Sequence, residues 1–154
     1  MLFRSLEQRR KRLPELLGRK RRSIDRDYFR AILSVDNPEC YEQRVIDAVA
    51  SATLALDDSI PNGSYIDMCM HLPVIDPAKI HVPTAVLRGQ FDGVAALDDL
   101  IEFFKRLPNP DKQFIMLSGM AHASFQQKNF RMVYHILHSF YTRPEPIYTA
   151  PGPH

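Results

Sequence analysis

Asp92 and His122 are the two residues of this chain whose types and spacing best fit a shared chemistry. A carboxylate that accepts a hydrogen bond from an imidazole fixes the tautomer of the ring and stabilises the imidazolium, while the imidazole moves a proton to and from a nucleophile. Thirty positions separate the two residues, enough for a loop, a crossover helix, a strand and a second loop. Asp92 and His122 could therefore supply both roles if the fold brings them together.

Other ionisable side chains fit these roles less well. Asp98 and Asp99 fall in the first turns of a predicted helix, where carboxylates favour the helix dipole, and we interpret them as structural. The linker histidines His71 and His81 have nothing nearby to orient their rings.

A metal site is not predicted either. His135 and His138 share one predicted helix at a spacing that metal ions use, but no third ligand is evident. We interpret both as solvent-facing and expect no metal and no cofactor.

Two strands and a helix are expected to position Asp92 and His122. Residues 84–87 and 113–117 are short apolar runs typical of strands, and residues 95–107 carry apolar side chains at helical spacing before a proline-rich stop. Strands joined by a helix are almost always parallel, so their carboxyl ends share one edge of the sheet, where α/β proteins build sites. We expect the Asp92 carboxylate to lie about 2.6 to 3.2 Å from His122 Nδ1.

This stretch, VPTAVLRGQFD followed by a helix and QFIMLSGMAH, resembles the last part of an α/β-hydrolase, in which an acid follows one strand and a histidine follows the next. The resemblance implies that Asp92 is the triad acid and His122 the triad base. It covers nearly the whole chain, because the segment before Pro83 looks like the helical cap of such enzymes. A pattern found at the end of the cap in one group of these enzymes is matched by Pro61, Asn62, Gly63 and Asp67.

The implied architecture is a partial α/β-hydrolase fold. Residues 1–82 would form a helical cap and linker, and residues 83–142 a strand–helix–strand–helix unit with parallel strands. Residues 143–154, rich in proline, would form a disordered tail.

The departure from the family is the absence of any G-x-S-x-G nucleophile elbow. The elbow and the oxyanion hole would lie upstream of Met1, so we expect the C-terminal half of an ester, amide or carbon–carbon bond hydrolase. Such a chain would be inactive alone and would act on a small-molecule substrate only with a complementing N-terminal half. The nearest substitutes for a nucleophile, none of them in a strand-to-helix turn, are Ser64, Ser118, Ser124 and Cys69.

A non-catalytic binding or interaction module is the alternative interpretation. The 154 residues are 45% hydrophobic and 25% charged, an ordinary composition, yet only two strands are convincing. A two-stranded sheet leaves both edges open to another chain or to a second copy, so we also expect self-association.

A third interpretation is a nucleic-acid binder, because a basic N-terminal arm can bind nucleic acid or an anionic surface. The sequence holds no nucleic-acid motif and little aromatic interleaving, so we expect neither nucleic acid nor membrane as a partner. Residues 1–22 hold nine Lys or Arg against two Glu, a balance of +7, so the rest sums to −5 for a total of +2. Interleaved leucines predict an amphipathic cap helix broken near Pro14.

Cys40 and Cys69 lie in apolar contexts and predict buried, reduced thiols. With no apolar signal core and no long apolar run, a cytoplasmic product is expected.

Further helices are expected in the cap and after His122. Ser23 would cap the first, and a turn at Asp36 to Pro38 would lead into the second, while residues 59–67 would form a turn. The second helix would bury Tyr41, Val45, Ala48, Val49, Ala52 and Leu56. The last helix would pack on the sheet through Phe125, Phe130, Val133, Tyr134, Leu137, Phe140 and Tyr141.

Overall fold

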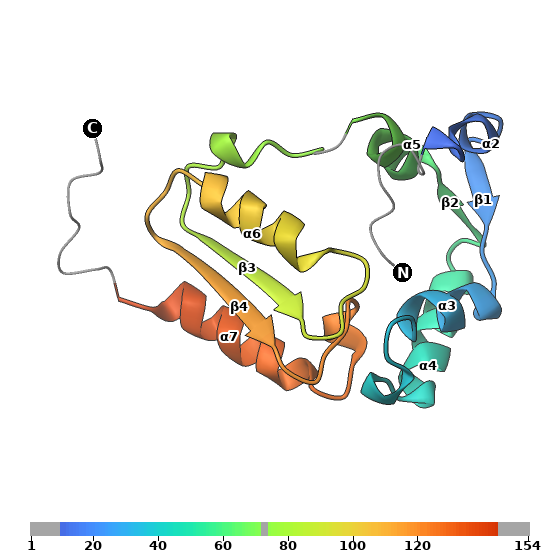
Figure 1. Ribbon diagram of the computed structural model, residues 1–154. Coiled ribbons are helices and arrows are strands. Elements are labelled where there is room, and N and C mark those ends of the chain that lie inside the picture. The colour runs from blue at the N-terminus through green and yellow to red at the C-terminus, as the bar shows by residue number, and fades with distance from the viewer. Residues whose placement is uncertain (1–9, 72–73, 145–154) are drawn as a thin grey trace.

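The computed structural model describes residues 10–71 and 74–144 of the chain. Figure 1 shows helices around a short antiparallel ribbon, followed along the chain by a parallel two-stranded sheet with two helices. The predicted mixed α/β class, with helices ahead of a strand–helix–strand–helix unit, is confirmed. No helix in these two ranges is long and apolar enough to cross a lipid bilayer.

The parallel sheet consists of β3 (Thr84–Gly89) and β4 (Lys112–Leu117), joined by α6 (Leu97–Arg106). Its register pairs Thr84 with Lys112 and Gly89 with Leu117, so both strands end at the same edge. The two predicted strands and the helix between them are confirmed, although β3 extends past residue 87 and the helix is shorter than expected.

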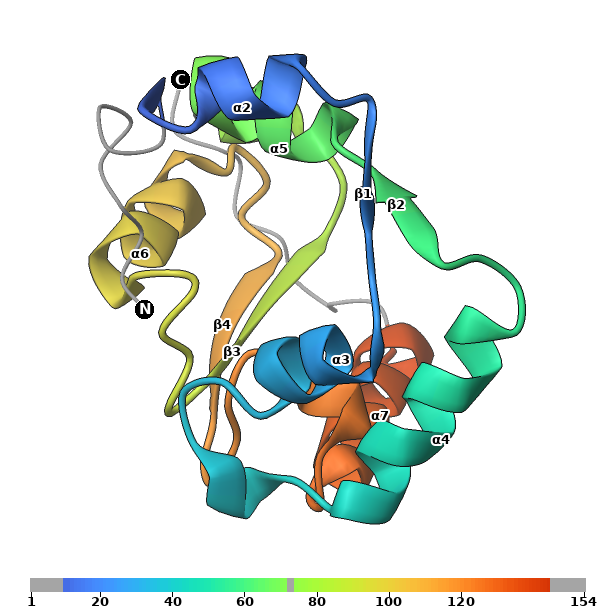
Figure 2. The same cartoon turned by 90° about the vertical axis from the view of Figure 1, so that its right-hand side faces the viewer.

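Helices lie on both sides of this sheet, α6 on one and α7 (Phe130–Thr142) on the other (Figure 2). Phe104 of α6 meets Phe114 of β4 with ring centroids 5.9 Å apart. On the opposite face, Leu87 and Ile115 pack against a buried cluster that includes Val133 of α7. Because side chains on both faces of the sheet pack against helices, the strands have nearly continuous apolar sequences.

Lys112 ties the end of α6 to the start of β4. The last carbonyls of a helix have no partner within the helix. The Lys112 ammonium donates to three of them, at 3.0 Å on Phe104, 3.2 Å on Lys105 and 2.7 Å on Leu107. This bond set fixes the turn between helix and strand.

The last helix differs from its prediction in its start and in part of its buried face: Val133 and Leu137 pack on the sheet as predicted, but most of the aromatic residues do not. A 3₁₀ turn (Ser124–Gln126) comes first, and α7 begins only at Phe130. Val133 is buried with Ile136 and Leu137 beside it, whereas Tyr134 is 57% exposed and Tyr141 78% exposed. The aromatic residues were misassigned because several of them contact one another on the surface: Tyr134 forms edge contacts with Phe125 and Phe130.

The first cap helix, α3 (Arg26–Leu33), is capped by Asp25 and not by Ser23. Asp25 Oδ1 accepts the Tyr28 N–H at 2.7 Å. Ser23 is instead the last residue of a strand, so the predicted cap is wrong by two positions.

The second cap helix, α4 (Gln43–Leu54), follows a 3₁₀ turn (Pro38–Cys40) that Asn37 caps through the Glu39 N–H. The predicted turn between the two helices is confirmed, but the predicted apolar stripe is only partly right: Tyr41 is buried and Val49 packs against the core, whereas other members are exposed. Ile46 and Ala50 are buried in the shared core with α3, while Leu56 lies past the helix and is 89% exposed. Ala48 and Ala52, also in the predicted stripe, are exposed.

Two short strands were missed in the sequence. β1 (Arg21–Ser23) pairs antiparallel with β2 (Ser59–Pro61), and α5 (Gly63–Met70) follows after Asn62. The predicted turn is therefore confined to Asn62, and the rest of residues 59–67 is strand and helix. Arg22 links α3 to α5 across this ribbon: its guanidinium stacks on Tyr65 at 4.0 Å and donates to Tyr28 at 3.3 Å.

The two chain ends are described only in part. Pro14 lies in the first turn of α2 (Leu13–Leu17) and helps to begin that helix; the rest of the predicted amphipathic helix, residues 1–9, lies outside the described residues. Residues 145–154 of the predicted tail lie outside them as well. Cys40 and Cys69 are buried and free, as predicted.

Candidate active site

The loops that follow β3 and β4 are joined backbone to backbone. Gln90 N–H donates to the Leu117 carbonyl at 2.9 Å, and Phe91 N–H donates to the Met120 carbonyl at 2.8 Å. Gly119 takes a positive φ of 69° and donates its N–H to Gln90 Oε1 at 2.9 Å. These bonds place Asp92 and His122 on neighbouring loops at the carboxyl edge of the sheet.

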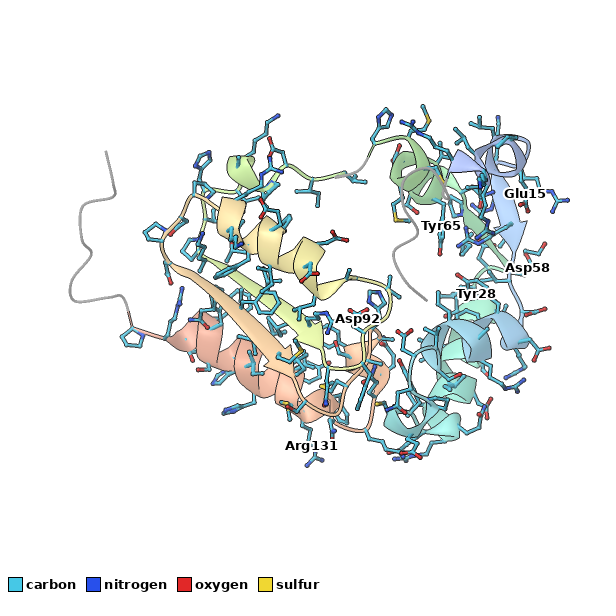
Figure 3. All side chains as sticks on the ribbon, in the orientation of Figure 1. Glu15, Tyr28, Asp58, Tyr65, Asp92 and Arg131 are labelled. Atoms are coloured by element: carbon cyan, nitrogen blue, oxygen red, sulfur yellow. The ribbon has the colours of Figure 1, made fainter. Side chains whose placement is uncertain are left out.

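Asp92 is a buried carboxylate with both oxygens engaged. Its Oδ1 accepts the Val94 N–H at 2.8 Å and the Ala95 N–H at 3.1 Å, while Oδ2 lies 3.1 Å from His122 Nδ1. The expected approach of acid and histidine is confirmed at the distance predicted. Figure 3 shows Asp92 beside the carboxyl end of β3.

The surroundings of Asp92 favour its ionised form. Burial raises the pKa of the Asp92 carboxyl, but the hydrogen bonds from His122, Ala95 and Val94 together outweigh burial, and the pKa lies below its ordinary value. The carboxylate is therefore charged at neutral pH and faces the imidazole as an acceptor.

The His122 ring is half exposed, with 49% of its side chain accessible, while the Asp92 side chain is only 8% accessible. The hydrogen bond with Asp92 raises the pKa of His122; burial opposes this, and the charges of Asp92 and Asp36 add to the rise. A ring held on its Nδ1 side and open to solvent is suited to exchanging protons with an approaching group.

The histidine loop rests on the cap hairpin through Gln127. The Gln127 side chain is 2% exposed; its Oε1 accepts the Ala121 N–H at 2.8 Å and its Nε2 donates to the Tyr41 hydroxyl at 2.9 Å. Lys128 N–H also donates to the Cys40 carbonyl at 2.9 Å. The turn between α3 and α4 thus supports the backbone one residue before His122.

Arg88 performs the corresponding task in the acid loop, where its guanidinium binds several backbone carbonyls. Sequence reasoning missed both Arg88 and Gln127. A signal existed for Arg88, because it is the one charged residue in the strand TAVLRG. No comparable signal marked Gln127.

The other residues considered in the sequence lie apart from this pair. Asp98 and Asp99 occupy the first turn of α6, as predicted. Asn62 of the cap pattern is buried and forms hydrogen bonds within the cap: its side chain donates to the Arg19 carbonyl at 2.7 Å and accepts from Arg22 at 3.0 Å. Among the described residues, no group of three His, Cys, Asp or Glu could hold a metal ion.

Among the described residues, no hydrogen bond joins the side chain of a substitute nucleophile to the His122 ring, although Ser64 follows the strand-to-helix turn between β2 and α5, where no substitute was expected. Cys69 is buried in α5, and Ser64 lies in the same helix. Ser124 opens the 3₁₀ turn and bonds to His122 only through the backbone, at 2.9 Å. Ser118 follows β4 and is exposed.

An open cavity of about 320 Å³ lies between β4 and α7. Its lining includes Gln113, His135, Ser139 and Arg143, but neither Asp92 nor His122. Gln113 stands near the amino end of β4, so this cavity is distant along the strand from the acid–histidine pair. We assign it no part in the candidate chemistry.

Comparison with known proteins gives a match in structure and none in sequence. No protein-family model matches the chain, and no curated protein sequence matches it. The fold is similar to that of a soluble variant of monoglyceride lipase from Saccharomyces cerevisiae, solved in complex with a substrate analogue, with a TM-score of 0.57 and 14% identity. The match covers 87% of this chain and 48% of the lipase chain.

A likeness at this identity shows the fold alone. The fold is mixed α/β and resembles part of the lipase fold, and the chain spans about half the length of that lipase.

Proposed function

We propose that this protein supplies the acid and the base of an α/β-hydrolase catalytic triad, and that the nucleophile comes from a polypeptide segment outside residues 1–154. The observation that carries this proposal is the 3.1 Å contact between Asp92 Oδ2 and His122 Nδ1, made by a buried acid to a half-exposed ring. The fold likeness to part of a lipase supports it.

Each residue has a defined role in the proposed reaction. Asp92 accepts the Nδ1–H of His122, which leaves Nε2 as the base that takes the proton of a nucleophilic hydroxyl. The resulting imidazolium is stabilised by the ionised Asp92 and returns the proton to the leaving group. The reaction class is hydrolysis of an ester, an amide or a carbon–carbon bond in a small-molecule substrate.

The nucleophile and the oxyanion hole must come from a complementing part. In this fold one oxyanion donor follows the nucleophile and the other belongs to an early strand's loop. The sequence holds no G-x-S-x-G, so neither donor is expected within it. The isolated chain is therefore proposed to be inactive.

A non-catalytic interaction module is the second candidate. It is favoured by the sheet itself: among the described residues β3 pairs with β4 only, and most residues of both strands stay partly exposed although helices flank the sheet. A sheet with open edges can bind another chain without any chemistry.

The test compares the isolated chain with the chain in complex with its copurifying polypeptides. The isolated chain and the affinity-purified chain with its copurifying polypeptides are assayed for hydrolysis of p-nitrophenyl butyrate and for covalent labelling by a fluorophosphonate. We expect no turnover from the isolated chain and turnover from the complex, falling about 10⁴-fold in Asp92→Asn because the wrong tautomer is then held.

Asp98→Asn and His138→Ala are the matched controls, since they remove the same side-chain types from α6 and α7 away from the pair. Both should retain the turnover of the complex. Turnover that survives His122→Ala would contradict the proposal, and a stable complex that shows neither turnover nor labelling would favour the interaction module. An isolated chain whose turnover is lost in Asp92→Ala or His122→Ala would show that the nucleophile lies within residues 1–154.

A further inference from the structure

Arg88 lies near the end of β3 and directs its guanidinium into the loop that carries Asp92. Its Nη2 donates to the carbonyl of Asp92 itself at 2.7 Å, and its Nη1 donates to the Gly89 carbonyl at 2.8 Å. Nε reaches the Ala95 carbonyl at 3.2 Å, and Nη1 also contacts the Gln90 carbonyl at 3.4 Å. One side chain therefore binds four backbone carbonyls within residues 89–95.

Arg88 and Asp92 form hydrogen bonds with complementary backbone groups of this loop. Asp92 Oδ1 accepts two of its backbone N–H groups, from Val94 and Ala95, while Arg88 supplies donors to its carbonyls. A guanidinium is planar and holds its five N–H donors in a fixed fork, so its bonds constrain the loop in direction as well as in distance. A lysine ammonium at the same position would keep the charge but lose the fork.

The bond to the Asp92 carbonyl has the most direct consequence. It fixes the backbone of Asp92, whose carboxylate oxygen Oδ2 faces His122 Nδ1. The opposite loop is held by Gln127, and the backbone bonds between the loops hold both of them. Arg88 is thus the side chain that sets the acid's half of the contact.

We propose that Arg88 is a positioning residue that holds the Asp92 carboxylate against the His122 ring by fixing the loop between β3 and α6. It acts through Asp92 and does not contact the imidazole. Its meaning for catalysis rests on the proposed function, whereas its effect on the contact between Asp92 and His122 is measurable in the isolated chain.

Removing Arg88 can change the pKa of His122 in two opposite directions, one through charge and one through position. Loss of a positive charge favours protonation of a nearby imidazole, so a purely electrostatic role predicts a higher pKa of His122 in Arg88→Met. Loss of position weakens the hydrogen bond with Asp92, which is the largest cause of the raised pKa of His122, and so predicts a lower pKa. The direction of the change distinguishes the two roles.

The experiment is an NMR titration of the His122 ring protons in the wild type, Arg88→Met, Arg88→Lys and Asp92→Asn. We expect the His122 pKa to fall in both Arg88 variants toward the value in Asp92→Asn, which marks complete loss of the acid's charge. Slow exchange of the amides between β3 and β4 checks that the sheet is retained. Arg106→Met is the control for charge, because Arg106 pairs with Asp76 at 3.2 Å, well apart from the loop, and should leave the titration unchanged.

An unchanged or higher His122 pKa in folded Arg88→Met would overturn the proposal, since the guanidinium would then contribute only stability or charge. If Arg88→Met does not fold, Arg88→Lys decides by the same criterion, with a fall supporting the proposal and no change refuting it. Failure of the proposed function would not affect this result, because the titration needs no turnover. In an active complex Arg88→Lys should lower kcat with little change in KM.

Discussion

Gly89 passes so close to Ala121 that a Cβ atom on Gly89 would lie 2.4 Å from the Ala121 carbonyl oxygen and 2.7 Å from that of Met120. Cβ atoms essentially never come within 3.0 Å of another heavy atom. The close approach lets the acid loop and the histidine loop exchange backbone hydrogen bonds. The absence of a side chain at Gly89 is thus a condition for the contact between Asp92 and His122.

The first prediction follows from this contact. Gly89→Ala should lower the free energy of unfolding by about 1 to 3 kcal/mol, the usual cost of overpacking a tight site. Gly63→Ala is the control, because an added Cβ there meets nothing within 4 Å. Urea unfolding measures both, and a Gly89→Ala variant as stable as wild type would show that the loops can separate at little cost.

The second prediction concerns the pH dependence of stability. The pKa of His122 is raised in the folded state, so its contribution is fully present below the ordinary value of 6.5 and is lost as the pH rises through the folded pKa. The pKa of Asp92 is lowered, so its contribution is present above 3.8 and is lost as the pH falls through the folded pKa. The pair should stabilise the fold most between these two ordinary values.

His122→Gln tests this window. The loss of unfolding free energy relative to wild type should be larger at about pH 5 than at about pH 9. The exposed His138, changed in the same way, should show little difference between the two conditions. An equal loss at both pH values for His122→Gln would mean that the contact with Asp92 does not discriminate between the charged and neutral ring.

The third prediction concerns the support of the histidine loop by the cap hairpin. Tyr41→Phe removes the acceptor of the Gln127 Nε2–H, a buried donor, and should cost about 1 to 3 kcal/mol of stability. Tyr141, which is 78% exposed, is the matched control for loss of a hydroxyl. Thermal unfolding compares Tyr41→Phe with Tyr141→Phe, and equal effects would show that Gln127 finds another acceptor.

The fourth prediction concerns the open edge of β3. Thr84 N–H bonds to the Asp111 carbonyl on the β4 side, so in an extended strand the N–H of Ala85 points to the other edge. We expect the isolated chain to self-associate in light scattering, and Ala85→Pro to reduce this association while keeping the fold, because proline blocks an edge donor. Val86→Pro should instead disrupt the pairing with β4, and a wild-type chain that is a monodisperse monomer would contradict the prediction.

The sequence by itself was enough to locate the unit that positions Asp92 and His122. Two apolar runs and the helix between them were predicted from local pattern, because strands covered by helices on both faces are rich in apolar residues and prolines stop a helix. The shared edge of Asp92 and His122 followed from the handedness of parallel crossovers, and the 3.1 Å contact agrees with it.

Only the tertiary structure decided which faces of the other helices are buried and what holds the two loops. α4 carries apolar residues on more than one side, and packing against α3 selects Ile46 and Ala50, whereas Leu56 stays exposed. β1 and β2 could not be found locally, because Arg22 pairs with Ile60 and neither short segment forms a strand without its partner. Gln127 likewise gains its role from Tyr41, which lies 86 positions away. The physical reason is the same in each case: periodicity and turn chemistry are local properties of the chain, whereas burial and buried hydrogen bonds depend on partners that only the folded chain brings together.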